Sequence, residues 1–314
     1  MAFPVAAGVR DMSSTTMRYI PVLYSGKMLV KFYNKTILSM ISNTDYEGEI
    51  RKFGDTVFIR TVPTLTVRDY KKGQALVNEQ PESTATSLLI DKGSYWSFVS
   101  EDLDKIQVDI KNYINQWAED ASEQMRITID TSVLQAMPAL VHASNTGAAA
   151  GAISADINLG ATGAAFALTK TNILEKIVDC GTVLDEQNVP DSGRFVILPP
   201  AYCGLIKKSD LKDAALAGDA TSVLRNGVLG MIDRFLVLNS NLLLSALGSG
   251  GDAARTCTSL LFGHKLATTF ATQLTETKVQ DNPTGFGMLH RGLQVYGYAV
   301  LKSEALGRLY AYLG

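Results

Sequence analysis

The stretch IQVDIKNYINQWAEDASEQMRITIDTSV, residues 106–133, carries the most sustained helical pattern in the chain. Apolar side chains recur along it every three or four residues, at Ile106, Ile110, Ile114, Trp117, Ala121, Met125, Ile129 and Val133. This spacing puts them on one face of an α-helix, which Pro138 ends. At about 1.5 Å per residue, such a helix is on the order of 45 Å long. We predict that it is the spine of the molecule, with a core-facing stripe that includes Ile110, Ile114, Trp117 and Met125.

The opposite face of the predicted spine helix is acidic. It carries Asp104, Asp109, Glu119, Asp120, Glu123 and Asp130. Because the charged side of an amphipathic helix normally faces water, this arrangement is typical of a solvated or subunit-facing surface and not of an acid/base pair.

Upstream of the helix, residues 56–91 have the pattern of a long two-stranded excursion. The run TVFIRTVPTLTV alternates like a strand, and its proline, Pro63, indicates an edge strand or two short strands. After the polar stretch RDYKKGQALVNEQPEST (68–84), the run STATSLLI alternates again. A lone two-stranded ribbon is marginally stable in water. We therefore predict that the excursion packs on a surface from elsewhere.

Residues 1–45 are predicted to form an arm with one amphipathic helix. Ser25 is a candidate cap, and the helix is expected to end near Asn43. Apolar residues recur in between at intervals of about 3.6 residues, at Leu29, Phe32, Tyr33, Ile37, Met40 and Ile41.

Beyond the spine helix, helical and strand patterns alternate. Residues 142–167 are rich in Ala, Gly, Ser and Asn without a period, so we expect a surface loop or insertion. Helices are predicted from Thr169 to before Pro190 and near 201–209, and a further short one in HKLATTFATQL (264–274). Strands are predicted at RFVIL (194–198), RFLVL (234–238), SLLFG (259–263) and LYAYL (309–313), with a strand pair within LHRGLQVYGYAVL (289–301).

Composition limits the class of protein. The 314 residues are 46% hydrophobic and 19% charged, which suits a globular chain of one large domain or two interleaved ones. The formal net charge is −2, so no domain-wide basic field draws the chain to nucleic acid or anionic lipid. The sequence predicts neither a signal peptide nor a membrane span. The three cysteines form no CxxC pair, which favours buried thiols over a disulfide framework or a zinc site.

The sequence offers no strong catalytic, cofactor-binding or metal site, and we expect none. The three histidines are far apart, and no HExxH or nucleophile-elbow motif surrounds them. Two residues keep an enzymatic alternative open: Cys203, at the start of a short helix, and His264, directly after a strand. For both, a packing or capping role is favoured. The glycines of GSGGD (248–252) are interpreted as a turn and not as a phosphate cradle.

Several loose motifs follow one another in order along the chain. They are NTDYEGEIRKFGDTVFI (43–59), the polar excursion, the long helix that ends at Pro138, LDEQNVPDSGRFVILPPAY (184–202), LRNGVLGMIDRFLVLNSN (224–241), FGHKLATTFATQ (262–273) and GLQVYGYAVL (292–301). With this series, over about residues 44–312, the chain resembles the major capsid (coat) proteins of tailed bacteriophages, and especially those of short-tailed phages.

The resemblance implies an α+β chain with the Hong Kong 97 capsid fold, which consists of four parts. These parts would be an N-terminal arm (1–50), an extended β loop (51–98), a peripheral domain with the spine helix (99–145 and 258–290), and an axial domain (146–257 and 291–314) in which 146–167 is a loop or insertion.

The resemblance also implies a structural function. The chain would self-assemble into the icosahedral shell that encloses the genome of a tailed bacteriophage, in the virion, after assembly in the host cytoplasm. Its expected partners are further copies in pentamers and hexamers, a separate scaffolding protein, a portal, a cement protein in some family members, and double-stranded DNA packaged without sequence specificity, with no membrane. Two alternatives remain: an encapsulin-like cellular nanocompartment shell with the same fold, and a soluble α/β enzyme that uses Cys203 or His264.

In this family the extended loop packs on a neighbouring subunit, which would supply the partner surface that the polar stretch requires. Its tip has charges of both signs, suited to pairing in a contact repeated around a ring. The expected contact residues are Arg68, Asp69, Lys71, Lys72, Glu79 and Glu82. In some family members a lysine of this loop forms a covalent cross-link to an asparagine of the neighbouring subunit. Lys71 and Lys72 are the candidate lysines for such a cross-link here. We expect no cross-link, because the sequence has no motif for the partner or for a catalysing acid.

Overall fold

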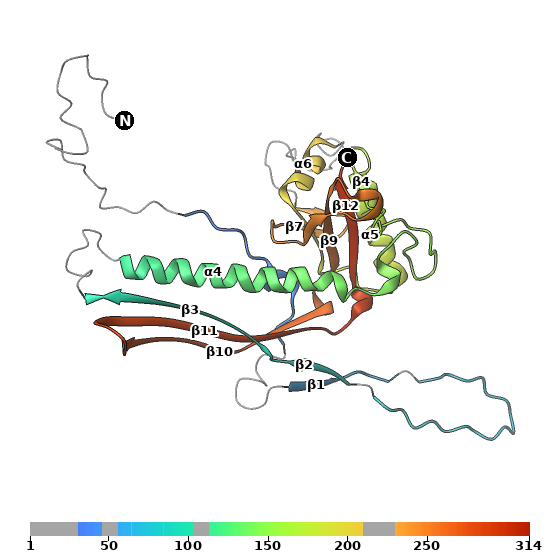
Figure 1. The fold of residues 1–314 in the computed structure, drawn as a ribbon. Coiled ribbons are helices and arrows are strands. Elements are labelled where there is room, and N and C mark those ends of the chain that lie inside the picture. The colour runs from blue at the N-terminus through green and yellow to red at the C-terminus, as the bar shows by residue number, and fades with distance from the viewer. Residues whose placement is uncertain (1–30, 46–55, 64, 84, 103–112, 210–229) are drawn as a thin grey trace, which may run out of the picture.

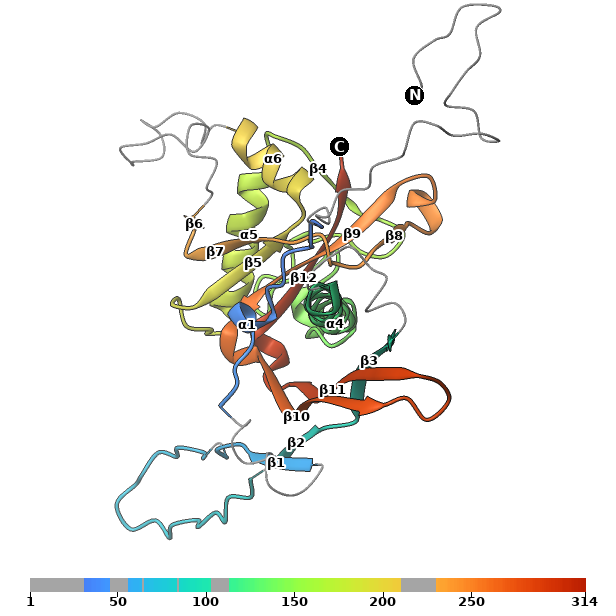
Figure 2. The same cartoon turned by 90° about the vertical axis from the view of Figure 1, so that its left-hand side faces the viewer.

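The structure is a computed structural model that describes residues 31–45, 56–63, 65–83, 85–102, 113–209 and 230–314. An elongated part is built on one long helix and a three-stranded sheet, and a second part is built on a seven-stranded sheet (Figure 1). A long loop projects from the elongated part on the side away from the helix (Figure 2). Helices and antiparallel sheet occur together, which confirms the predicted α+β class.

The long helix α4 (Tyr113–Ala136) lies along the three-stranded antiparallel sheet. The strand order in that sheet is β10 (Thr268–Asp281), β11 (Gly287–Val300) and β3 (Lys92–Glu101). The helix is followed by a 3-10 turn (Met137–Ala139) that contains Pro138, as a proline at a helix end requires. The predicted spine helix is thus confirmed over 113–136, while residues 103–112 lie outside the described residues.

The excursion begins as a two-stranded ribbon, as predicted. Strands β1 (Thr56–Arg60) and β2 (Ala85–Leu89) pair antiparallel. A small core fastens this ribbon to the three-stranded sheet: Leu88, Ile90 and Ala271 are buried together, with Val57, Ile59, Val295 and Ala299 packed against them. The base of the excursion therefore has a partner surface within its own chain, and only residues 61–83 extend beyond it.

The second part contains the seven-stranded sheet. Its strands run in the order β4 (Phe166–Leu168), β12 (Leu306–Leu313), β9 (Thr256–His264), β5 (Arg194–Leu198), β7 (Phe235–Asn239) and β6 (Met231–Ile232), and β8 (Ser245–Leu247) pairs with β9. All five residues of β5 are buried. Four of them, Phe195–Leu198, form a consecutive apolar run, which is what a strand covered on both faces requires.

One main core joins the seven-stranded sheet to its neighbours. Helices α5 (Ile173–Glu186) and α6 (Pro200–Lys208) contribute to it, as do the end of α4 and the one-turn helix α1 (Leu38–Ile41). Its fully buried side chains include Ile41, Val133, Leu134, Leu184, Ile206 and Phe262. The arm, the spine helix and the sheet are therefore packed as one body through the last turns of α4.

The amphipathic helix predicted between Ser25 and Asn43 is wrong over its described part. Residues 31–37 form neither helix nor strand, and only Leu38–Ile41 is helical. Phe32, expected on the apolar stripe, is 99% exposed, whereas Ile37 and Ile41 are buried. The helical period does not hold here, because Phe32 lies in a segment without regular structure and has no surface to pack on among the described residues.

The predicted short helix in residues 264–274 is also wrong. After a 3-10 turn (Lys265–Ala267) the chain continues as β10, because TTFATQ pairs with the distant strand β11. The strand pair predicted within 289–301 is a single strand, β11, with β10 and β3 on either side. The domain boundaries expected at 258 and 291 therefore fall inside two strands: β9 lies in the seven-stranded sheet and β11 in the three-stranded one.

Two helices and four strands agree with the sequence predictions, whereas β3, β4, β6 and β8 were not predicted. The helices expected after Thr169 and near 201 are α5 and α6, and the four predicted strands are β5, β7, β9 and β12. Residues 142–167 form a loop, stabilised by isolated bridges between Ala150 and Ile157 and between Ala161 and Ala164.

Candidate assembly surfaces

The loop beyond β1 and β2, residues 61–83, is almost fully exposed. Apart from Pro63, every residue described in it is exposed. Its limbs run apart (Figures 1 and 2) and are tied across by an ion pair between Arg68 and Glu79, whose carboxylate also accepts the backbone N–H of Thr66 at 3.3 Å. Within the described chain, residues 65–83 form no hydrogen bond or ion pair with any other part of the subunit.

The six predicted contact residues of the loop are all exposed. The structure brings Arg68 and Glu79 together, but as partners within one loop. The other four make no ion pair with described residues; they are Asp69, Lys71, Lys72 and Glu82. Arg68 and Glu79 therefore contribute to the shape of the loop, and the remaining four charges are available to another molecule.

The loop also carries apolar side chains that sequence reasoning missed as contact residues. They are Val62, Leu65, Val67, Tyr70, Leu76 and Val77, all at least 61% exposed. Leu65 and Val67 continue the alternation of the first strand-like run, but the set as a whole follows no period, so the sequence did not single these residues out as contact residues. Apolar side chains concentrated on one projecting segment mark a protein–protein contact.

The first half of α4 rests on aromatic side chains of the sheet. Trp117 makes edge contacts with Tyr113 and Phe98, at ring-centre distances of 5.0 and 5.9 Å, and Phe98 stacks on Trp96 and His290. Trp117 is nevertheless 43% exposed. The sheet covers one side of the helix here and no described layer covers the other.

The predicted core stripe of the spine helix is thus only partly a core. Trp117 is a correction, because it lies at a half-covered surface of the subunit. Ile114 is half-buried, and Met125 is half-buried against the main core. Ile110 lies outside the described residues.

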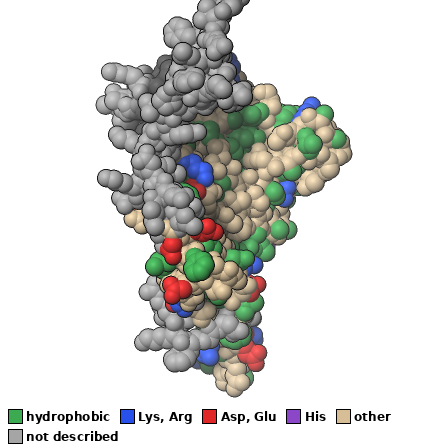
Figure 3. Space-filling model, turned by 60° about the vertical axis from the view of Figure 1, so that its left-hand side comes forward, with side chains coloured by type: hydrophobic (Ala, Val, Ile, Leu, Met, Phe, Trp, Pro, Cys, Tyr) green, Lys and Arg blue, Asp and Glu red, His purple; other side chains and the backbone are tan. Residues whose placement is uncertain are grey.

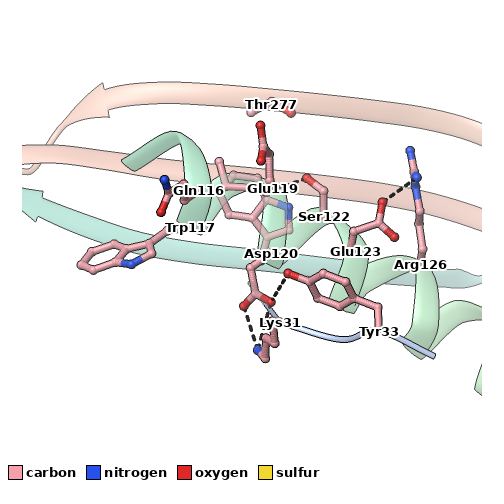
Figure 4. A pocket seen from close by; sticks show the side chains of 12 residues that line it. Lys31, Tyr33, Gln116, Trp117, Glu119, Asp120, Ser122, Glu123, Arg126 and Thr277 are labelled. Carbon is pink, nitrogen blue, oxygen red and sulfur yellow. Dashed lines mark hydrogen bonds and ion pairs between the residues drawn. The ribbon is translucent and has the colours of Figure 1, made fainter. Parts of the chain in front are cut away.

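A groove of about 960 Å³ runs between the arm, the first half of α4 and the sheet (Figure 4). Asp120 lies in it, between two arm residues. It accepts hydrogen bonds from the Lys31 ammonium at 2.9 and 3.1 Å and from the Tyr33 hydroxyl at 2.9 Å. The bond from Lys31, helped by the one from Tyr33, holds the pKa of Asp120 below its usual value.

Asp130 holds the arm at a second place on α4, three turns further on. The sequence placed it on a solvated or subunit-facing side, but only 5% of it is exposed. One of its carboxylate oxygens accepts the backbone N–H groups of Ile37 and Leu38, at 2.7 and 3.2 Å, at the start of α1. Burial raises the pKa of Asp130, against the effect of these two bonds.

Neither residue of the enzymatic alternative has a reactive setting. Cys203 is buried, and burial raises the pKa of its thiol, which disfavours the nucleophilic thiolate. His264 accepts the N–H of Leu266 on Nδ1 at 3.1 Å, so Nε2 carries the proton and donates to the carbonyl of Ser192 at 2.6 Å. Both ring nitrogens of this buried histidine are therefore engaged with backbone groups.

Two further features are absent from the described residues: a cluster of metal-ligating side chains and a membrane-spanning helix. No group of three or more His, Cys, Asp or Glu side chains is placed to hold a metal ion among the residues that the structure describes. No helix in the same residues is long and apolar enough to cross a membrane. Hydrophobic, acidic and basic side chains are intermixed on the face drawn in Figure 3.

Comparisons with known proteins agree with this architecture. A family model described as phage capsid protein matches residues 84–306. A solved structure from Mycobacterium phage Che8 is similar at 23% identity and a TM-score of 0.75, over 92% of this chain and 96% of that one. The capsid structure of cyanophage P-SCSP1u is similar at 14% identity and a TM-score of 0.71, over 100% of both chains.

A third similar structure is the mature capsid of bacteriophage PhiM1, at 15% identity and a TM-score of 0.68, over 98% of this chain and 97% of that one. No curated protein matches the chain significantly. The structural likenesses extend over nearly the whole chain and show the fold.

Proposed function

The chain belongs to the phage capsid protein family, and from that premise we propose how its copies join to one another. It is a major capsid protein, a structural component of the virion whose copies form the icosahedral shell. The observation that carries the proposal is the loop of residues 65–83, with its exposed apolar side chains and its base fastened by a small core. We propose that this loop packs on a neighbouring copy in the shell.

Burial of apolar side chains is the main source of affinity in this contact. Moving a Val or Leu side chain from full exposure to full burial contributes roughly 1.5–3 kcal/mol. Val67, Tyr70 and Leu76 are each at least 70% exposed, so a neighbour that covers them gains most of that amount. Asp69, Lys71, Lys72 and Glu82 would set the register of the contact, because charge pairs at a rim add specificity more than strength.

The proposed parts of the subunit follow the observed sheets. The arm (1–50) keeps the bounds predicted from sequence, whereas the extended loop would run from 51 to 91, because β3 begins at Lys92 in the three-stranded sheet. The peripheral domain would consist of α4 with β3, β10 and β11, and the axial domain of the seven-stranded sheet with α5 and α6. The two boundaries thereby move from 258 and 291 to the ends of β9 and β11.

Further features of the assembly are proposals that rest on the family. The shell would contain pentamers and hexamers of this chain, assembled in the host cytoplasm with a separate scaffolding protein, a portal and, in some relatives, a cement protein. It would hold double-stranded DNA without sequence specificity, in keeping with the net charge of −2. It would have no enzymatic activity, no cofactor and no membrane partner. A short-tailed phage as its source rests on the order of the sequence motifs.

The test replaces residues 68–83 by a short Gly/Ser turn. The subunit should keep its helical signal in circular dichroism and its melting temperature, because none of these residues belongs to the two cores. Shells should fail to form, as measured by light scattering and electron microscopy with the scaffolding protein present. A shortened loop that folds and assembles at the normal rate would exclude the loop as the contact.

A milder variant separates the apolar contribution from the loss of the loop. Changing Leu76 and Val77 to Ser should slow assembly while the loop keeps its length. The control is Ile153→Ser, which removes an apolar side chain that is at least as exposed from the 142–167 loop. Equal slowing by both would mean that surface hydrophobicity in general, and not this loop, drives assembly.

A further inference from the structure

Residues 31–34 lie across the first half of α4 as an exposed strap (Figure 4). They form neither helix nor strand, and Phe32 is 99% exposed. Within the described chain, their hydrogen bonds and their ion pair all end on one carboxylate, that of Asp120. Among the described residues, this one side chain of the spine helix accounts for every polar contact of the segment.

The strap adjoins a firmly held segment. The carbonyl of Lys35 accepts a long hydrogen bond, 3.5 Å, from the hydroxyl of Ser240. Two residues later the backbone N–H groups of Ile37 and Leu38 bond to buried Asp130, and the side chain of Ile37 enters the main core. The chain thus changes from an exposed segment with one tie to a buried one within three residues.

We propose that residues 31–34 are a releasable strap, clasped by Asp120, and that lifting the strap exposes the groove beside Trp117. The basis is the difference between the two attachments. An exposed ion pair shifts an equilibrium by no more than about five-fold, because water and salt compete for both charges. The buried attachment at Asp130 stays intact when the strap lifts, so no part of either core has to unfold. The proposal does not depend on where the loop 65–83 packs.

The chain contains its own reporter for this opening. It has two tryptophans, Trp96 and Trp117, and both line the groove together with Lys31 and Tyr33. Trp117 lies one helical turn before Asp120 on the same face of α4. Quenching of tryptophan fluorescence by acrylamide therefore measures how accessible the groove is in the unassembled full-length subunit.

The decisive experiment reverses the two charges of the clasp. Asp120→Lys alone and Lys31→Asp alone should each raise the acrylamide quenching constant, reflecting an opening equilibrium shifted by up to about five-fold. The double variant, with Lys31→Asp and Asp120→Lys, restores an opposite-charge pair with the native net charge. Its quenching should return towards that of the native protein.

The matched control is Glu119→Lys, which makes the same change of charge one residue away. The Glu119 side chain points towards Thr277 and not to the arm (Figure 4), and in the described chain it forms no hydrogen bond or ion pair with residues 31–34. Its quenching should equal that of the native protein. In the native protein itself, rising salt should increase quenching, and it should have less effect once Asp120→Lys has removed the clasp.

The proposal is overturned if Asp120→Lys leaves quenching unchanged, or if Glu119→Lys raises it equally. It is also overturned if the quenching constant of the double variant stays as high as that of the single variants. If circular dichroism shows that Asp120→Lys does not fold, two measurements still test the proposal: the salt dependence of quenching in the native protein, and the quenching of the double variant. Quenching of the native protein that does not respond to salt then contradicts a clasp held by charge.

Discussion

At the scale of single residues, Arg194 is the most constrained charge in the described chain. Its side chain is fully buried at the start of β5, and it donates to the carboxylate of Asp185 at 2.7 Å and to the carbonyls of Val189 and Pro190 at 2.6 and 2.9 Å. Exposed Arg234 binds the same carboxylate from outside, at 2.8 Å. Arg194 therefore links α5, the following loop and the sheet. Arg234 binds the solvent-facing side of the Asp185 carboxylate.

Replacing Arg194 by Ala should lower the free energy of unfolding by about 3–5 kcal/mol, because the carbonyls of Val189 and Pro190 lose their donor, the Asp185 carboxylate keeps only Arg234 among the described residues, and the buried side chain leaves a cavity. Arg194→Lys should recover little, since an ammonium cannot reproduce the planar set of donors. Arg234→Ala is the control, and as an exposed pair it should cost no more than about 1 kcal/mol. Urea unfolding measures all three. Equal costs at the two arginines would contradict the structural role of Arg194.

At the scale of elements, α4 is one helix with two environments. Its last turns enter the main core, where Val133 and Leu134 are fully buried, while its first half lies on the sheet with Trp117 half-exposed. Leu134→Ala should therefore cost about 2–5 kcal/mol of subunit stability. Trp117→Ala should cost less, about 1–2 kcal/mol, in contrast to the ~3–5 kcal/mol of a buried aromatic residue.

Thermal or urea unfolding of the two variants as unassembled subunits tests this order. Assembly of Trp117→Ala is a separate measurement, because a half-exposed tryptophan can also serve a contact in the shell. If Trp117→Ala destabilises the isolated subunit more than Leu134→Ala, a surface missing from the described chain covers this tryptophan.

The same helix shows what periodicity can and cannot predict. The spacing of apolar residues correctly predicted α4, because a long regular pattern depends on local geometry. It could not tell which part of the stripe is covered within the subunit, since that depends on β3 and β11, which are distant in sequence. Asp130 was placed on the solvated or subunit-facing side for the same reason: its partners are backbone groups of the arm, 92 and 93 residues away. The segment that became β10 was misassigned because its partner strand, and not its own composition, decides its conformation.

At the scale of the whole molecule, the order of the sequence motifs predicted the fold, through the resemblance to a known family. The local periodicity of apolar residues did not predict it. Pattern reasoning alone gave separate helices and strands, with β11 divided and β10 missing, and could not have predicted two sheets that share one spine helix. The loop shows the reverse case. Its charges were predicted as contact residues, but the ion pair between Arg68 and Glu79 depends on how the limbs approach, and the sequence does not contain that distance.

This pairing changes the expected effect of charge reversal in the loop. Arg68→Glu would disturb the loop's own tie, whereas Lys71→Glu with Lys72→Glu removes charges that have no ionic partner among the described residues. The double lysine variant should therefore fold normally and assemble more slowly. Each rim pair contributes only about 0.2–1 kcal/mol, but every subunit of the shell repeats the contact.

Salt distinguishes this electrostatic effect from a damaged loop. Raising the ionic strength should bring the assembly rates of the native protein and the Lys71/Lys72 variant together, because it screens exposed charges. The matched control reverses the adjacent pair Lys207 and Lys208 at the end of α6, with the same change in net charge from −2 to −6. Light scattering at low and high salt gives the rates. If the control is slowed as much as the loop variant, total charge governs assembly; if the loop variant assembles normally at low salt, the lysines do not face a neighbour.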